Sequence, residues 1–379
     1  MMSIETLVEI SRFYGENPEY VLAGGGNTSL KNKDTLYIKG SGSSLAEAVP
    51  DSFVKMDRNA LNLIWGKKYP TSSAERESAV LADIMASRRA GEEKKRPSVE
   101  VMLHDILPFS YVVHLHPALV NGLTCSRRGE EAMREIFGEK PVWIPSTNPG
   151  YVLSKKAKTA MDDYSAARGE PAAVIFLQNH GVFVGNNSAD GIKETYDEIM
   201  RKIGACIKKK PDFSGEKRLV AGGHDGARNG ATIDEIIKTL AELAGAAVFL
   251  QAGEIESLVK DRASFAPVSS AFTPDHIVYA GSDPLFIEAN NAAGIRDAWK
   301  NHAKKTGRNP KIAAVQGLGV FGAAATEKAA SLALDLFTDS VKVAVYSESF
   351  GGPRFMTHDE IDFINNWEAE RFRTNVSVK

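Results

Sequence analysis

Two histidines, His114 and His116, stand two residues apart in an apolar, β-branched run at residues 112–117 (VVHLHP). Such a run favours a strand, and side chains on a strand alternate between its faces, so both imidazoles point the same way. Two imidazoles on one face supply a large part of a protein zinc site. Two hydrogen-bonded strand histidines explain the same pattern, and this alternative stays open on these residues alone.

A third candidate ligand, His180, ends another apolar run at residues 172–181 (AAVIFLQNHG). The chain has eight histidines, and His116 and His180 stand directly before Pro117 and Gly181. Histidines at such strand ends suit ligands at the mouth of a sheet better than core positions. The sequence therefore favours a metal site built from His114, His116 and His180.

Composition limits the class of protein. The chain has 379 residues, enough for two domains, with 43% hydrophobic and 25% charged residues, as in soluble globular proteins. The formal net charge of −2 gives no electrostatic reason to expect a nucleic acid or a membrane as partner. The two cysteines, Cys125 and Cys206, are far apart, which argues against a disulfide framework. With no signal peptide or spanning segment recognised, we expect a cytoplasmic protein.

Two loops rich in glycine and hydroxyl groups precede the histidines, at residues 22–30 (LAGGGNTSL) and 40–44 (GSGSS). Glycines let backbone amides approach an anion closely, and Asn27 and Ser29 add donors. Neither loop is a P-loop or a dinucleotide fingerprint. One such loop alone is more typical of a flexible hairpin, but two of them together favour a phosphate or carboxylate cradle.

Residues 96–100 (RPSVE) open a predicted helix, with Ser98 at its start and Glu100 in or near its first turn. A glutamate there can simply complement the helix dipole, or pair with His104 four residues later. The best linker candidate spans residues 209–230, which carry many glycines and little apolar content. We therefore expect one domain at residues 1–208 and an α/β unit at residues 231–379.

Taken together, the motifs at residues 26–29, 40–42, 97–100, 114–116 and 178–181 resemble the class II aldolase/adducin family, in that family's order. The resemblance covers residues 4–208 and implies an α/β/α fold around a central, mainly antiparallel sheet. It implies Zn²⁺, or another divalent metal, held by His114, His116 and His180. Glu100 matches the catalytic acid/base. The residues expected to bind the substrate phosphate are Asn27, Ser29, Ser41, Gly42 and Ser98.

The chain departs from the family pattern at three places. Val99 stands where fuculose-phosphate aldolases carry a second serine. Lys39 and Ser41 differ from the residues that the family usually has in the second loop. The segment between Glu100 and His114 is shorter than in those enzymes. It is similar instead to the aldolase half of bifunctional rhamnulose-1-phosphate aldolase/alcohol dehydrogenase proteins, a resemblance that extends through residues 230–379. No dinucleotide fingerprint of a dehydrogenase half occurs in the sequence.

Two stretches of the second unit echo the first. Residues 275–282 (DHIVYAGS) resemble residues 34–41 (DTLYIKGS), and residues 314–321 (AVQGLGVF) resemble residues 176–183 (FLQNHGVF). In that register Leu318 replaces His180. The hypothesis is a shortened, metal-free partial repeat, and two generic strand–turn matches explain the echoes equally well.

The resemblance implies a metal-dependent aldehyde-lyase that cleaves a ketose 1-phosphate, of the rhamnulose-1-phosphate type, to dihydroxyacetone phosphate and an aldehyde. A dehydratase or epimerase acting on a sugar phosphate is the alternative within the family, and glutamate at position 100 favours the aldolase or dehydratase. A non-catalytic, adducin-like module and a plain domain with core histidines are the remaining readings. The family also implies a homo-oligomer, with a tetramer favoured.

Overall fold

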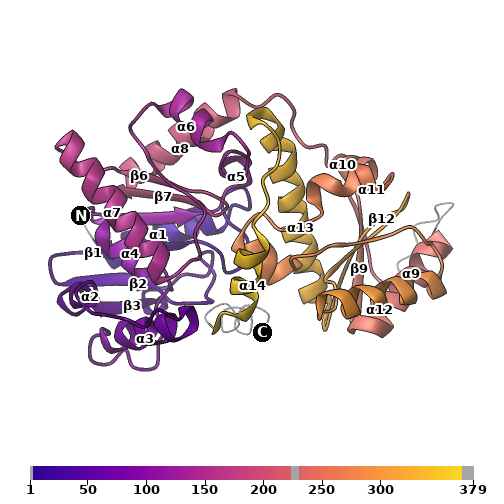
Figure 1. The fold of residues 1–379 in the computed structure, drawn as a ribbon, viewed down its shortest axis with the longest axis horizontal. Helices are drawn as coiled ribbons and strands as arrows, with labels where there is room; N and C mark the ends of the chain where they lie inside the picture. The colour runs from indigo at the N-terminus through magenta and orange to yellow at the C-terminus, as the bar shows by residue number, and fades with distance from the viewer. Residues whose placement is uncertain (1–2, 223–229, 369–379) are drawn as a thin grey trace.

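The computed structural model describes residues 3–222 and 230–368, which form two β-sheets flanked by helices (Figure 1). Helix α13 (Glu327–Ser347) lies between the sheets and packs against α5 (Ala118–Thr124). A Cβ atom on Gly122 would stand 2.4 Å from the Cβ of Tyr346. The close approach of these two helices therefore depends on a residue without a side chain.

The first sheet has the strand order β3-β2-β1-β4-β7-β6-β5. Every neighbouring pair is antiparallel except β5 and β6, so the sheet is mainly antiparallel, as predicted. Its strands are β1 (Asn27–Lys31), β2 (Thr35–Lys39), β3 (Phe53–Asp57), β4 (Tyr111–Leu115), β5 (Val142–Ile144), β6 (Val174–Leu177) and β7 (Gly181–Asn186).

Helices cover both faces of this sheet and give the expected α/β/α layers. The alternation along β4 explains the layers, because Val113 and Leu115 pack in one core and Val112 packs in the other. One layer contains α1 (Ile4–Gly15), α5, α6 (Gly129–Phe137) and α8 (Ala189–Ala205). The opposite layer contains α2 (Arg58–Ile64), α3 (Ser73–Ala86), α4 (Val101–Ile106) and α7 (Tyr151–Arg168).

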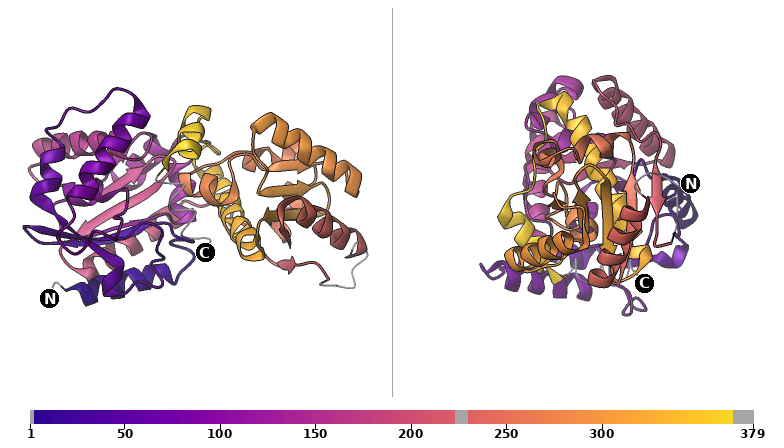
Figure 2. Two further views of the ribbon diagram at one scale, coloured as in Figure 1. Left: turned by 90° about the horizontal axis from the view of Figure 1, so that it is seen from below. Right: turned by 90° about the vertical axis from the view of Figure 1, so that its right-hand side faces the viewer.

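The second sheet has the order β10-β11-β12-β9-β8 and stands beside the first (Figure 2). Its strands are β8 (Lys217–Leu219), β9 (Ala246–Gln251), β10 (Leu285–Ile287), β11 (Ile312–Val315) and β12 (Gly319–Ala324). Helices α9 (Gly230–Ala244) and α12 (Ala292–Thr306) cover one face. The other face carries α10 (Gly253–Leu258), α11 (Arg262–Phe265), α13 and α14 (His358–Asn366).

Two sequence-based expectations about the second half need correction. Residues 217–219, inside the predicted linker, form β8, which pairs with β9. We call residues 217–222 and 230–368 the C-terminal unit; its status as a separate domain stays a prediction. Residues 275–282, expected to echo a strand, instead contain a π-helix, His276–Ala280, whose five residues are all buried. An apolar run buried on all sides does not reveal its backbone period.

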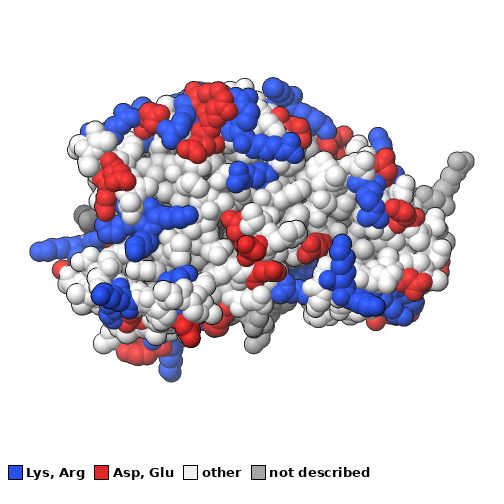
Figure 3. All heavy atoms as spheres, in the orientation of Figure 1, with Lys and Arg blue, Asp and Glu red and all other residues white. Residues whose placement is uncertain are grey.

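The charged residues are mixed over the surface. On the face drawn in Figure 3, Lys and Arg alternate with Asp and Glu, in keeping with the formal net charge of −2. Within residues 3–222 and 230–368, no helix combines the length and the apolar character that crossing a bilayer requires.

Candidate metal centre and active site

The first two candidate ligands come from the end of β4, as their spacing predicts. His114 is fully buried, pairs in register with Phe183 of β7, and stacks on the ring of Phe183 with 3.9 Å between the ring centroids. His116 follows the last residue of the strand, where the sheet opens to the pocket described below. Their ring centroids lie 4.6 Å apart, so the two imidazoles share one face of the strand.

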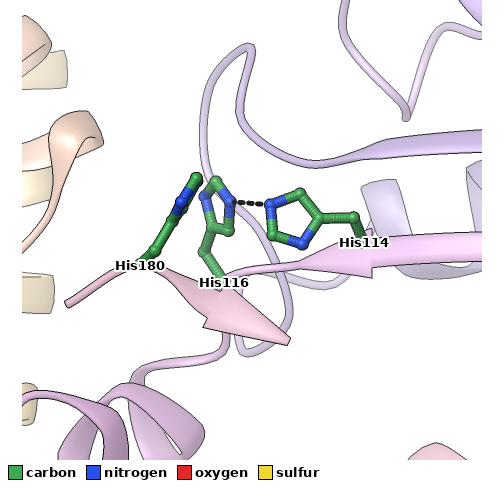
Figure 4. A group of neighbouring side chains, drawn as sticks. All are labelled: His114, His116 and His180. Carbon is green, nitrogen blue, oxygen red and sulfur yellow. Dashed lines mark hydrogen bonds between the residues drawn. The ribbon is translucent and has the colours of Figure 1, made fainter. Parts of the chain in front are cut away.

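The third candidate ligand lies in the tight connection between β6 and β7. The chain turns there because Asn179 adopts a left-handed conformation with φ of 56°, which asparagine tolerates better than most residues. The turn places His180 beside β4, and Figure 4 shows the three rings converging. One nitrogen from each ring lies within 4.8 Å of the others. The structure thus brings together the three histidines that the sequence singled out.

Hydrogen bonds fix which nitrogen of the two β4 histidines faces the centre. His114 donates its Nδ1–H to the carbonyl of Val182 at 3.0 Å, and His116 donates its Nδ1–H to the carboxylate of Asp275 at 2.6 Å. Their Nε2 atoms stand 2.8 Å apart. With each Nδ1 carrying the proton, two Nε2 lone pairs face one another, an arrangement that a cation between them relieves.

The third imidazole has the same electronic character. Burial lowers the pKa of His180 to about 3, although the nearby Glu100 carboxylate acts in the opposite direction. His180 is therefore neutral at ordinary pH and offers a lone pair. Three neutral imidazoles suit Zn²⁺ and leave open coordination positions for a substrate. The donor set of this chain fits a divalent metal.

Glu100 borders the three histidines. It is the N-cap residue of α4 and only 5% exposed, and its two oxygens lie 3.4 Å from His114 Nε2 and 3.5 Å from His180 Nε2. Its Oε1 accepts no hydrogen bond from the described residues. A buried carboxylate oxygen without a donor is costly unless a ligand, a proton or a cation satisfies it. This oxygen is therefore the candidate proton acceptor of the site.

A chain of buried side chains orients Glu100. Asn27 donates its Nδ2–H to Glu100 Oε2 at 2.7 Å, so its Oδ1 is left to accept from His104 Nε2. Ser29 Oγ in turn contacts His104 Nδ1 at 2.7 Å. Burial lowers the pKa of His104 well below its usual range, so the ring stays neutral and acts as a hydrogen-bonding spacer. The expected pairing of His104 with Glu100 thus runs through Asn27.

This network corrects one predicted phosphate ligand. Ser29 was expected to bind the anion, but its side chain is fully buried, bonded to His104 and absent from the pocket lining. Asn27 and Ser29 both contact His104, because they lie two residues apart on β1 and so share one face of that strand. Ser29 lies one step farther along β1, however, beneath the site. Asn27 lines the pocket, but one of its amide hydrogens is bonded to Glu100.

The remaining predicted residues of the anion cradle do border one pocket. Ser41, Gly42 and Ser98 line it together with Glu100, His116 and His180. Lys39, noted in the sequence as a departure from the family pattern, also lines it and is only 3% exposed. Its ammonium group donates to the carbonyls of Gly24 and Gly26 at 3.3 and 3.1 Å. A buried positive charge therefore stands in the wall that the two glycine-rich loops form.

The C-terminal unit closes the pocket. Pro274 lines it, and the neighbouring Asp275 holds His116. The cavity measures about 30 Å³, little more than the space for one or two water molecules. No local sequence signal marks Pro274 or Asp275, because they lie far along the chain from the motifs.

Comparison with known proteins gives the family. The family model described as "Class II Aldolase and Adducin N-terminal domain" matches residues 5–201. A Bacillus subtilis (strain 168) protein described as the uncharacterized oxidoreductase YuxG is 25% identical over 305 residues, 76% of this chain and 42% of that protein. The chain thus spans less than half the length of this curated relative.

Several solved structures are similar to about half of the chain. The N-terminal class II aldolase domain of a Thermoplasma acidophilum protein is 26% identical, with a TM-score of 0.45, over 54% of this chain and 92% of that one. YgbL of Klebsiella pneumoniae, a putative aldolase/epimerase/decarboxylase, is 17% identical, with a TM-score of 0.38, over 53% and 86%. An L-fuculose 1-phosphate aldolase is 17% identical, with a TM-score of 0.37, over 53% and 83%.

The family model covers more than half of the 379 residues, and its range contains the whole first sheet and all three histidines. The chain belongs to the class II aldolase and adducin family.

Proposed function

We propose that this chain is a zinc-dependent aldolase that cleaves a ketose 1-phosphate to dihydroxyacetone phosphate and an aldehyde. The observation that carries the proposal is the convergence of three imidazoles beside the unsatisfied oxygen of Glu100, at a pocket that His116, His180 and Glu100 line. Lys39 and the loop at residues 40–42 line the same pocket. A site with a metal-binding end and an anion-binding end fits a phosphorylated hydroxy-ketone.

The anion-binding end would hold the phosphate. Ser41 and Ser98 offer hydroxyl donors, Gly42 offers a close backbone, and the ammonium group of Lys39 supplies positive charge nearby. Gly42 adopts a φ of 82°, which glycine reaches at no steric cost. Binding energy from the phosphate would orient the carbons that react several ångströms away.

Glu100 would move the proton. Its Oε1 would accept the proton of the substrate hydroxyl as the carbon–carbon bond breaks, which releases the aldehyde and leaves the bonding electron pair on the ketose fragment. The same carboxyl group would return a proton to the carbon of that fragment, giving dihydroxyacetone phosphate. Asn27 would hold Oε2 throughout, so that the reacting oxygen keeps its direction. A divalent metal bound by the three histidines supplies Lewis acidity that stabilises the negative charge on the ketose oxygens.

The test measures metal content by elemental analysis on the wild type and on His180→Ala, with a coupled assay for dihydroxyacetone phosphate. The assay uses a panel of ketose 1-phosphates that includes rhamnulose 1-phosphate. We expect near-stoichiometric zinc that disappears in the variant, and turnover of one panel member. Zinc without dihydroxyacetone phosphate would contradict aldol cleavage and direct the search to a dehydratase or epimerase. A metal-free wild type would contradict the mechanism and favour a binding module.

The cellular setting belongs to the same proposal. We propose a cytoplasmic homo-oligomer, with a tetramer favoured, as the family resemblance implies. The two cysteines, Cys125 and Cys206, are both free in the structure, which agrees with a reducing compartment. Light scattering on the purified protein gives the oligomeric state, and a monomer would contradict this part of the proposal.

A further inference from the structure

One residue of the C-terminal unit reaches into the metal site. Asp275 lies next to the π-helix, His276–Ala280, and is 5% exposed. Its Oδ2 accepts the Nδ1–H of His116 at 2.6 Å, across a sequence separation of 159 residues. Asp275 lies outside the matched range of the family model, which ends at residue 201.

The N-terminal loop leaves room for this carboxylate. A Cβ atom on Gly25 would stand 2.5 Å from Asp275 Oδ2, closer than real Cβ atoms approach an oxygen. Gly25 needs no left-handed backbone angle, so space is what this position provides. The absence of a side chain at Gly25 therefore allows Asp275 to reach His116.

The segment that carries Asp275 is itself tied to the ligand hairpin. Asn179, the residue before His180, donates its Nδ2–H groups to the carbonyls of Phe272 at 3.0 Å and Arg354 at 2.7 Å. The N–H of Met356 donates to the carbonyl of Ala271 at 3.0 Å. The C-terminal unit thus contacts two of the three ligand positions, His116 directly and His180 through its neighbour.

The charge of the partner distinguishes the two β4 ligands. The Nδ1–H of His114 is held by a neutral carbonyl, and that of His116 by a buried carboxylate. A carboxylate partner fixes the tautomer and the ring orientation of a histidine and makes its other nitrogen a better metal ligand. Removing such a partner typically weakens metal binding about 10–100-fold.

We propose that Asp275 is a positioning residue of the metal site, and that the C-terminal unit thereby completes this site within one chain. The inference rests on the metal site of the proposed function and goes beyond it, because it assigns a task to residues outside the family domain.

The experiment measures zinc affinity by competition with a chromogenic chelator on the wild type, Asp275→Ala and Asp275→Asn. We expect the alanine variant to bind zinc about 10–100-fold more weakly. The asparagine variant keeps a hydrogen-bond acceptor and loses the charge, so we expect an intermediate affinity. Asp297→Asn, an exposed acid on α12, is the matched control and should leave the affinity unchanged.

A spectrum separates positioning from general stability. The visible absorption of the cobalt-substituted protein reports the geometry of the ligands, and we expect it to change in Asp275→Ala and to recover toward wild type in Asp275→Asn. Wild-type affinity and spectrum in Asp275→Ala would overturn this inference while leaving the proposed function standing. A wild type that binds neither zinc nor cobalt would overturn both.

Gly25→Ala tests the same contact with the carboxylate still present. The added methyl group should displace Asp275 and weaken zinc binding in the wild-type background. In the Asp275→Ala background the same change should add little, because the contact it disturbs is already gone. Additive losses in the double variant would overturn the inference. If Asp275→Ala does not fold, the single variant Gly25→Ala decides, because zinc affinity at the wild-type level in that variant would overturn the inference.

Discussion

The two sheets of this chain share a framework and differ in chemistry. Strands β5-β6-β7-β4-β1 of the first sheet follow the same order as β10-β11-β12-β9-β8 of the second. In both runs the first pair is parallel and the remaining pairs are antiparallel. A helix connects the parallel strands in each case, α7 in the first sheet and α12 in the second.

The similarity extends to single hydrogen bonds in the two matching hairpins, β6–β7 and β11–β12. The N–H of Gln178 donates to Ile144, and the N–H of Gln316 donates to Ile287. The following residue has a positive φ in both hairpins, 56° at Asn179 and 71° at Gly317. This agreement supports the echo between residues 176–183 and 314–321. The echo proposed for residues 275–282 fails, because that segment is helical.

The difference lies in the side chains at the ligand positions. His114 pairs with Phe183 in the first sheet, and Phe249 pairs with Phe321 at the matching place in the second. When the two sheets are matched in this register, Gln251 occupies the position equivalent to that of His116. Leu318 occupies the position equivalent to that of His180. The shared backbone frame therefore does not by itself produce a cluster of metal-ligating side chains. At the three ligand positions the second sheet carries Phe249, Gln251 and Leu318, and none of these is a histidine.

The largest effect should come from placing the second sheet's residue in the first. His180→Leu removes one imidazole, and we expect bound zinc to fall to background and turnover to fall below detection. Elemental analysis and the dihydroxyacetone phosphate assay measure both. The reciprocal Leu318→His should acquire no metal, since two partner imidazoles are missing there. Full zinc occupancy in His180→Leu would contradict the assignment of His180 as a metal ligand.

The next largest effect should come from Glu100, and it should change turnover without changing metal binding by the three histidines. Glu100→Gln keeps an acceptor for Asn27 but removes the base, so turnover should fall about 10²–10⁴-fold. Zinc content should stay at the wild-type level, because the three imidazoles are intact. Steady-state kinetics on the identified substrate, paired with elemental analysis, separate the two properties. Near-normal turnover would assign the proton transfer to another group.

A smaller effect should distinguish the two left-handed hairpin residues. Asn179→Gly keeps the turn but loses two hydrogen bonds to Phe272 and Arg354, so the free energy of unfolding should fall by about 1–3 kcal/mol. Gly317→Asn should change it by less than about 0.5 kcal/mol, because a Cβ there meets nothing within 4 Å and asparagine tolerates the angle. Urea unfolding measures both, and equal losses would contradict the reasoning.

The smallest effect concerns Lys31, a buried lysine of β1, and Lys311, a half-buried lysine just before β11. Burial lowers the pKa of Lys31 to about 7 and that of Lys311 to about 8. Because these folded-state pKa values lie below the unfolded value, the unfolded chain binds more protons between about pH 7 and pH 10, and stability rises with pH there. Lys31→Met should flatten this rise more than Lys311→Met. Urea unfolding at about pH 7 and pH 9 tests the slopes, and unchanged slopes would refute the assignment.

Much of the site was predictable because its key residues lie on local patterns. The two-residue spacing of His114 and His116 on a strand gave their common face, and the short apolar run before His180 gave the third position. Ser29 was misplaced because it was taken as a donor of a glycine-rich loop, whereas it belongs to β1 and its hydroxyl is bonded to His104 beneath the pocket. Asp275 escaped prediction because its partner lies 159 residues away, and no local pattern encodes such a contact. Strand β8 was missed because two of its three residues are exposed and charged.

The position of Asp275 also sets an order of events during synthesis. All three ligands have left the ribosome soon after residue 180, yet the carboxylate that holds His116 is made nearly a hundred residues later. At roughly 5–20 residues per second, several seconds separate the two. A nascent chain can therefore display its three imidazoles before their support exists. If Asp275 positions His116 as proposed, tight metal capture would follow completion of the second half of the chain.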